Sequence, residues 1–285
     1  MNATGDRHLD QNKSTAAPYD TLYIYYLRGC LKPNYGIADN HFIGTWEEDG
    51  FSFLFFSRPS HKKVDILLQK QTQLALIDDY RITYDDWHGG KIIPYTSGSF
   101  LISPPWEKCD TGTSRHHILL DPGVVFGTGA HTTTKDCLEA IELAFDEHRI
   151  ESTIDLGTGT GLLALAAARL GCKQTLAVDL NFLAVKTAMK NIFLNRLENK
   201  MLAVQGRAEE FIDCHSDLVI ANIHHDVMKH LVNSKGFLGK RQFVLSGLLR
   251  SQTRDVMDIL SMHPVEIIKK WEGDGVWHTL YGRVC

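Results

Sequence analysis

Long apolar runs are absent from this chain of 285 residues. No stretch approaches the roughly 18 consecutive apolar residues that a membrane-spanning helix requires, so no membrane span is expected. The region after Met1 also lacks the apolar core of a secretory signal peptide. We therefore expect a cytoplasmic protein.

An excess of charge is also missing. The formal net charge is -4 and the pI is near 6.4, which gives no overall attraction to nucleic acid or to an anionic membrane. The 6 cysteines are scattered without a C-x-x-C pair, and the histidines show no spacing typical of zinc ligands. We expect neither a disulfide framework nor a metal site. The G-x-S-x-G elbow of one common hydrolase arrangement is absent too.

The composition changes along the chain and predicts three parts. Residues 1–18 are polar and aperiodic, as in a disordered leader. Residues 19–106 begin with β-rich runs, and Glu47-Glu48-Asp49-Gly50 between two apolar stretches predicts a hairpin. A helical pattern from about His61 to Gln73 and a further strand near Tyr80–Tyr84 follow, so this part is predicted to be a small α+β domain. Its last segment, residues 92–106, is rich in Gly, Ser and Pro and is interpreted as a connection.

Residues 107–285 alternate between strand and helix patterns, which predicts an α/β domain. Such alternation is typical of a mostly parallel sheet covered on both faces. The C-terminal part of this domain departs from the alternation of strands and helices, because residues 265–270 and 276–284 predict a terminal antiparallel hairpin. The other candidate strands are Thr153–Leu156, Thr175–Asp179, Met201–Gln205, Leu218–Asn222 and Gln242–Ser246.

A glycine-rich turn between the first two of these strands carries the clearest chemical signal. Gly157, Gly159 and Gly161 allow the backbone to turn sharply and to approach a ligand too closely for a Cβ atom. Asp179 ends the second strand, a position at which a carboxylate can accept both hydroxyls of a ribose. The unit is therefore predicted to hold a nucleoside-bearing cofactor.

Three classes of ligand could explain this turn, and the turn could also bind no ligand. A nicotinamide cofactor favours G-x-G-x-x-G, but Leu162 stands at the third glycine position. A phosphate-binding P-loop requires Lys-Ser/Thr after the glycines, and none follows Gly161. The remaining pattern, in which Asp155 precedes the glycines, resembles motif I of class I S-adenosylmethionine-dependent methyltransferases.

An upstream segment makes the resemblance more specific. Residues 121–134 read DPGVVFGTGAHTTT and resemble the corresponding segment of the PrmA family, methyltransferases of a large-subunit ribosomal protein. Asp217–Ile223 and Ser246–Leu249 are similar to later segments of that family, and the similarity extends over roughly residues 117–285. It implies a Rossmann-like fold with a seven-stranded, mostly parallel sheet, preceded by a small α+β domain that recognises the protein substrate.

The resemblance also implies site residues. The family's cofactor contacts correspond to Thr134, Gly157, Asp179 and Asn222 here, and Phe126 is expected to wall the cofactor. Asp155 and Gly159 complete the expected S-adenosylmethionine site.

For catalysis, the Asn222 amide is expected to orient an amine, since it ends a strand at the edge where ligands bind in open α/β sheets. Its alternative role is to cap the next helix. His224 is a candidate proton acceptor, or else a solvated residue at a helix start.

The implied activity is methylation of lysine or N-terminal amino groups of a protein, most simply a ribosomal protein. Residues 28–41 depart from the family pattern, and Gly89-Gly90-Lys91 stands where the family has a tryptophan. These departures leave the substrate open, so methylation of RNA or of a small molecule stays an alternative. A nicotinamide-dependent oxidoreductase and a non-catalytic cofactor-binding protein are the more distant ones.

Overall fold

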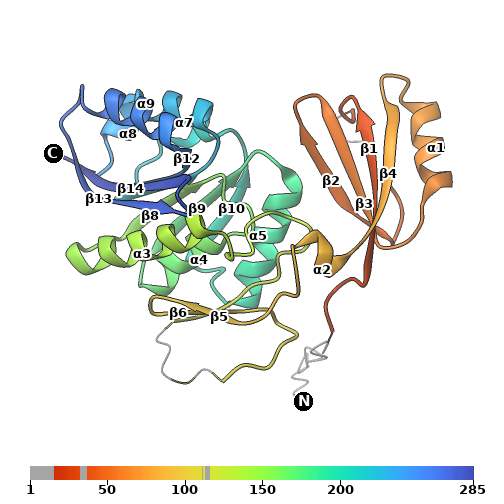
Figure 1. Cartoon of the computed structure of the whole chain (residues 1–285), viewed down its shortest axis with the longest axis horizontal. Coiled ribbons are helices and arrows are strands. Elements are labelled where there is room, and N and C mark those ends of the chain that lie inside the picture. The colour runs from red at the N-terminus through yellow and green to blue at the C-terminus, as the bar shows by residue number, and fades with distance from the viewer. Residues whose placement is uncertain (1–15, 33–36, 111, 113–115) are drawn as a thin grey trace, which may run out of the picture.

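The computed structural model describes residues 16–32, 37–110, 112 and 116–285. A large α/β unit and a smaller sheet with one long flanking helix lie side by side (Figure 1). The predicted leader, residues 1–18, lies almost wholly outside the described residues.

The strands are β1 (Thr21–Arg28), β2 (Phe42–Glu48), β3 (Phe51–Phe56), β4 (Ala75–Thr83), β5 (Tyr95–Ser97), β6 (Phe100–Ser103), β7 (His116–Leu119), β8 (Ser152–Leu156), β9 (Gln174–Asp179), β10 (Met201–Gln205), β11 (Leu218–Asn222), β12 (Gln242–Leu249), β13 (Val265–Gly273) and β14 (Trp277–Val284). The helices are α1 (His61–Lys70), α2 (Tyr84–Trp87), α3 (Thr132–Glu147), α4 (Leu162–Arg169), α5 (Phe182–Leu194), α6 (Ala208–Phe211), α7 (His225–Val232), α8 (Lys235–Leu238) and α9 (Arg250–Leu260).

The large sheet has seven strands in the order β10-β9-β8-β11-β12-β14-β13. The pairs from β10 to β12 are parallel, whereas β14 runs antiparallel to both β12 and β13. The strand order reverses between β8 and β11, which makes their carboxyl ends the point where open α/β sheets bind ligands. The predicted fold class, including the terminal hairpin, is confirmed.

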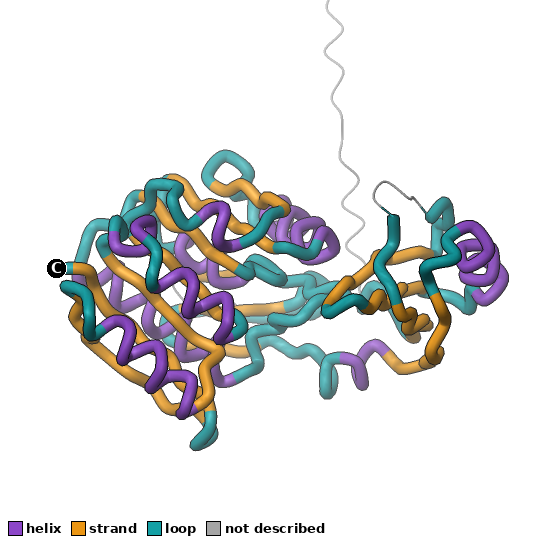
Figure 2. The backbone as a smooth tube through the Cα atoms, turned by 90° about the horizontal axis from the view of Figure 1, so that it is seen from above, coloured by secondary structure: helices purple, strands orange, loops and turns teal. Residues whose placement is uncertain are grey.

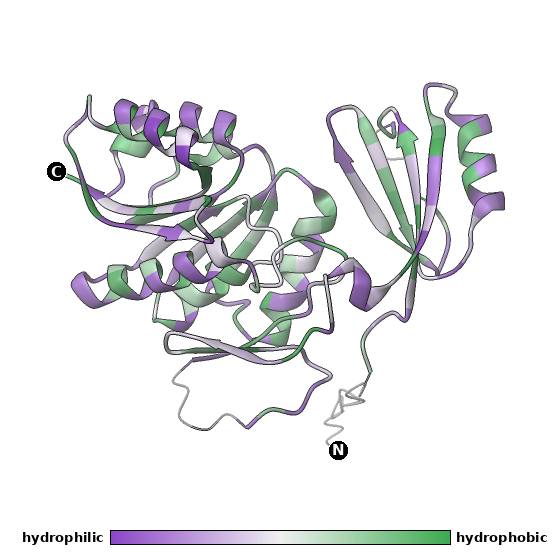
Figure 3. Cartoon of the chain, viewed as in Figure 1, coloured by the Kyte–Doolittle hydropathy of each residue, from purple (hydrophilic) through white to green (hydrophobic). Residues whose placement is uncertain are grey.

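Helices cover both faces of this sheet because the strands are apolar on both sides. One buried cluster joins α3 and α4 to the sheet through residues such as Leu138, Leu165 and Ile220. The other joins α7 and α9 through Met228, Val256 and Leu245. Hydrophobic colour runs through the strands, and hydrophilic colour marks much of the outer helix surfaces (Figure 3). Among the described residues, no helix has the length and apolar character needed to cross a bilayer.

The small sheet has the order β2-β3-β1-β4, all neighbours being antiparallel. The predicted hairpin of β2 and β3 is confirmed. One face packs on α1 through Val64 and Leu67. The helix ends at Lys70, earlier than the pattern through Gln73 indicates. The strand expected around residues 80–84 instead begins at Ala75, and Tyr84 already belongs to α2.

The other face of the small sheet is joined to the large unit. A buried cluster combines Leu22 and Phe55 of the sheet with Val124 and with Leu183 of α5. Gly44 of β2 lies so close to α5 that a Cβ atom there would come within 2.5 Å of Leu183 Cδ1. Figure 2 shows the small sheet to one side of the large unit, connected to it through several loops.

Residues 92–106 are more than the connection that their composition suggests. β5 and β6 form a hairpin, and β6 pairs in parallel with β7 in a three-stranded sheet. Phe100 and Ile102 are buried in the cluster beneath α3 and α4. Strands of three or four residues are too short to show a periodicity, so no sequence pattern predicts them. The division of the chain at residue 106 stays a prediction.

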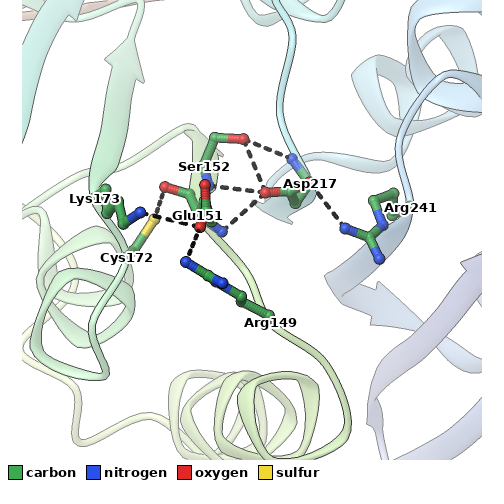
Figure 4. A network of polar contacts seen from close by, with 7 residues as sticks. All are labelled: Arg149, Glu151, Ser152, Cys172, Lys173, Asp217 and Arg241. Carbon is green, nitrogen blue, oxygen red and sulfur yellow. Dashed lines mark hydrogen bonds and ion pairs between the residues drawn. The ribbon is translucent and has the colours of Figure 1, made fainter.

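Asp217 holds together the amino ends of two central strands (Figure 4). Its Oδ2 accepts hydrogen bonds from the backbone N–H groups of Glu151 at 2.9 Å and Ser152 at 3.0 Å, and from the Ser152 hydroxyl at 3.2 Å. Arg241 Nη1 lies 3.4 Å from Oδ1. Burial raises the pKa of Asp217, but these hydrogen bonds outweigh it and hold the pKa below its usual value.

Asp217→Asn is therefore expected to lower the free energy of unfolding by about 1–3 kcal/mol at pH 7, the usual effect of losing a partly buried, hydrogen-bonded carboxylate. Because the folded-state pKa is lowered, this contribution is present above the unfolded pKa of about 3.9 and disappears as the pH falls through the folded value. Urea unfolding at pH 7 and near pH 3 measures it, with exposed Asp258→Asn as the matched control. An equal deficit at both pH values would contradict the assignment.

Candidate cofactor and amine site

A cleft of about 960 Å³ opens at the carboxyl ends of β8, β9 and β11. It lies where the order of the sheet reverses, and its size is at the upper end of ordinary ligand pockets. Segments from both parts of the chain line it: Trp46, Glu48, Trp87–Gly89, Val125–Thr128, Ala130, His131, Thr133, Thr134, Gly157–Thr160, Leu162, Leu163, Asp179, Leu180, Gly206–Glu209, Asn222–His224 and Val227.

The glycine turn forms the floor of this cleft. Gly157, Gly159 and Gly161 have φ of 74°, 55° and 86°, a region that L side chains rarely adopt. A Cβ atom on Gly157 would meet Ile223 Cγ2 at 2.2 Å, and one on Gly159 would meet the Phe126 carbonyl oxygen at 2.9 Å. The glycines therefore serve both the turn and the close approach of the neighbouring loops.

Asp179 ends β9 beside this turn. Its Oδ2 accepts a hydrogen bond from the Gly159 N–H at 2.9 Å, and its Oδ1 accepts one from the Asn181 N–H at 2.8 Å. The residue is 9% exposed and lines the cleft. Burial raises its pKa, and the two backbone hydrogen bonds oppose that rise. Each oxygen keeps a further lone pair for a ligand hydroxyl.

Asp155 lies under the turn and is not among the lining residues. It is 1% exposed, and its Oδ2 accepts hydrogen bonds from the Thr158 hydroxyl at 2.6 Å and from the Ala164 N–H at 3.2 Å. Burial raises the pKa of Asp155 to about 7. Asp155 therefore stabilises the turn from the side that faces away from the cleft. A direct contact between Asp155 and a cofactor stays a prediction.

The segment with Phe126 closes over the turn. The Thr160 hydroxyl donates to the Gly127 carbonyl at 2.7 Å. Asn191, fully buried on α5, donates to the carbonyl oxygens of Asp121 at 3.0 Å and Thr160 at 2.9 Å. Phe126 itself is 70% exposed at the mouth of the cleft. Two loops distant in sequence are thus fixed as one wall.

Asn222 lines the same cleft at the end of β11. Its Nδ2 donates to Thr133 Oγ1 at 3.3 Å, and that hydroxyl lies 2.8 Å from His131 Nδ1. Because Nδ2 is engaged, Oδ1 is the atom of the amide that can accept a further hydrogen bond. Thr134, next along α3, is 7% exposed and also lines the cleft.

His224 and its neighbour differ in environment. The His224 side chain is 86% exposed, lines the cleft and lies 3.6 Å from Glu48 of β2. His225 is 12% exposed and lies 3.5 Å from Asp255. A proton-accepting role for His224 stays a prediction, as do the assigned roles of the other site residues.

The structure adds residues that sequence reasoning missed. Trp46, Glu48 and Trp87 reach the cleft from the small sheet and from α2, and nothing in their local sequence signals this. The Trp87 indole N–H donates to the Val124 carbonyl at 3.2 Å, which binds α2 to the Phe126 segment. Gly206–Glu209 were also missed, although they follow the carboxyl end of β10, a position that the ligand rule for parallel sheets indicates.

Comparison with known families identifies the chain. The family model described as ribosomal protein L11 methyltransferase (PrmA) matches residues 68–284. The chain belongs to this family. The match includes the glycine turn, Asp179 and Asn222, and it confirms the resemblance that residues 121–134 indicate.

Curated relatives carry the same description. The ribosomal protein L11 methyltransferase of Desulfitobacterium hafniense is 39% identical over 187 residues, 65% of this chain and 58% of that protein. That of Carboxydothermus hydrogenoformans is 36% identical over 193 residues, 67% of this chain and 62% of that protein. The matched regions thus span less than two thirds of these relatives' lengths.

A solved structure agrees with the fold. The crystal structure of the ribosomal protein L11 methylase from Lactobacillus delbrueckii subsp. bulgaricus superposes with a TM-score of 0.58 at 26% identity. The superposition covers 67% of this chain and 98% of that one. The class I methyltransferase fold is therefore shared over most of the solved chain.

Proposed function

We propose that this PrmA-family protein is an S-adenosylmethionine-dependent methyltransferase that methylates amino groups of ribosomal protein L11. The observation that carries the proposal is the juxtaposition of Asp179 and Asn222 across the glycine turn in one cleft. One residue offers a carboxylate to a nucleoside and the other an amide oxygen to an amine. The curated relatives are named as methyltransferases of ribosomal protein L11, and a ribosomal protein as substrate favours a cytoplasmic location for the enzyme.

The residues present fit this cofactor. The Gly159 N–H orients the Asp179 carboxylate at 2.9 Å, so that it can accept ribose hydroxyls. Leu180, 61% exposed beside it, and Ala208 offer apolar surface for a base. The absence of a Lys-Ser/Thr pair after the glycines suits a cofactor without a pyrophosphate. Thr134 and Gly157 line the remaining part of the floor.

Bound S-adenosylmethionine supplies a methyl group on a sulfonium, which a neutral amine can attack directly. The chain's contribution is positioning and desolvation. Thr133 holds the Asn222 amide through Nδ2, which leaves Oδ1 to accept a hydrogen bond from the incoming amine. Burial of the amine in the cleft lowers its pKa and so favours the neutral, nucleophilic form. His224 is the candidate that carries the released proton to solvent.

Asp179→Ala is expected to weaken S-adenosylmethionine binding at least tenfold, the equivalent of about 1.4 kcal/mol, because the ribose hydroxyls lose their acceptor. Isothermal titration calorimetry measures the change, with exposed Asp258→Ala as the control. Wild-type protein that does not bind the cofactor, or an Asp179→Ala variant that binds it equally well, would contradict the cofactor assignment.

Asn222→Ala is expected to lower kcat for methyl transfer to L11 by about 10–100-fold, since an orienting hydrogen bond contributes about 1–3 kcal/mol. Radiolabelled methyl transfer measures kcat and KM together. Asn233→Ala, at the exposed far end of α7, is the matched control. Full kcat in the Asn222 variant would remove this residue from the proposed mechanism, and label entering only RNA or small molecules would overturn the protein substrate.

A further inference from the structure

A single row of side chains crosses the small sheet from its inner edge to its outer edge. The strand register pairs Trp46 of β2 with Phe53 of β3, Phe53 with Tyr26 of β1, and Tyr26 with Asp78 of β4. Residues paired directly across strands point to the same face. This set, Trp46, Phe53, Tyr26 and Asp78, is called the aromatic row below.

The aromatic row lies on the face opposite α1. Phe53 and Trp46 border the cluster that packs against α5, whereas Tyr25, the neighbour of Tyr26, belongs to the cluster under α1. The Tyr26 and Phe53 rings stack with centroids 4.6 Å apart. All three aromatic side chains are only partly buried, and Asp78 is exposed. Among the described residues, no other segment forms a strand beyond β4.

The row is continuous with the cofactor cleft. The Trp46 ring meets the Phe126 ring edge to face, with centroids 6.0 Å apart. Phe126 lies at the cleft mouth, next to the wall built on the glycine turn. An extended macromolecular chain that leaves the cleft over the small sheet would therefore contact Trp46 first and Asp78 last.

Both ends of this path carry carboxylates. Glu48 lies at the cleft end, where its Oε2 accepts a hydrogen bond from the Trp46 indole at 3.2 Å. Asp78 lies at the outer end. Aromatic faces bind cationic side chains, with carboxylates adding attraction, while the same carboxylates repel phosphate groups.

We propose that the aromatic row is the docking track for an extended, lysine-bearing segment of the protein substrate. This inference rests on the proposed methylation of a protein amine. The acceptor lysine enters the cleft past Phe126, the following residues lie across Trp46, Phe53 and Tyr26, and a second basic residue reaches Asp78. The row spans about 14 Å because neighbouring strands lie about 4.8 Å apart, and an extended chain covers about 3.3 Å per residue. The second basic residue is therefore about four to six positions from the acceptor.

Adjacent residues of β4 and β1 provide matched controls. Asp79 follows Asp78 but points to the α1 face, where it lies 3.6 Å from His61. Tyr23 likewise packs with the α1 cluster. The test compares Asp78→Asn and Tyr26→Ser with Asp79→Asn and Tyr23→Ser, using calorimetric binding of L11 and of lysine peptides, steady-state methyl transfer, cofactor binding and thermal unfolding.

Asp78→Asn is expected to raise the Kd and KM for L11 two- to fivefold, and Tyr26→Ser threefold or more, with kcat and cofactor binding unchanged. The difference from Asp79→Asn should shrink with added salt, because Asp78 acts through an exposed charge. In lysine peptides, neutralising a lysine four to six positions from the acceptor should raise the Kd for wild-type protein two- to fivefold. The same change in the peptide should leave the Kd for Asp78→Asn unaltered.

Equal effects of Asp78→Asn and Asp79→Asn, with methylation of L11 intact, would overturn the docking track and leave the proposed function standing. Conversely, L11 could stay unmethylated while lysine peptides bind the wild-type protein more tightly than they bind the Asp78→Asn variant. That result would support the docking track and contradict L11 as the substrate. A ribosomal RNA oligonucleotide whose binding is lost in Tyr26→Ser, or a wild-type dimer that dissociates in Tyr26→Ser, would assign the row to another partner and overturn the proposal.

Discussion

The hydrogen bond from the Gly159 N–H to the Asp179 carboxylate is the contact on which the site depends. It joins the turn after β8 to the end of β9, and it fixes the direction in which the carboxylate faces the cleft. The left-handed conformations of the glycines make this approach possible. Because Ile223 packs directly against Gly157, the same turn also sets the place of Asn222. One piece of backbone thus positions both Asp179 and Asn222, the residues that we propose hold the cofactor and the acceptor amine.

A second constraint is the packing of the small sheet against α5. Gly44 allows β2 to approach Leu183, and this approach brings Trp46 and Glu48 to the cleft mouth. The Trp87 indole holds the Phe126 segment from the other side. The small sheet and α2 therefore contribute directly to the walls of the cleft, so a substrate that enters the cleft also meets side chains of this part of the chain.

The sequence predicted best where local rules determine the structure. Five central strands follow from apolar runs that alternate with helical patterns, and the terminal hairpin follows from two runs joined by a short glycine-containing turn. The position of Asn222 in the cleft follows from the rule that ligands gather at the carboxyl ends of parallel strands. β4 was recognised only at its end because its residues are mostly exposed and show no alternation. The roles of Trp46 and Trp87 at the cleft arise from contacts between distant segments, and no local pattern encodes such contacts. Gly206–Glu209 directly follow β10 and line the cleft, so the strand-end rule is sufficient to predict their position.

The mass of ribosomal protein L11 purified from cells with and without this gene tests the central claim most directly, because it requires no assumption about cofactor concentration or assay conditions. The account predicts that L11 from the deletion strain is lighter by one or more methyl groups, and that wild type restores the mass whereas Asn222→Ala does not. An identical L11 mass in both strains would contradict methylation of this protein.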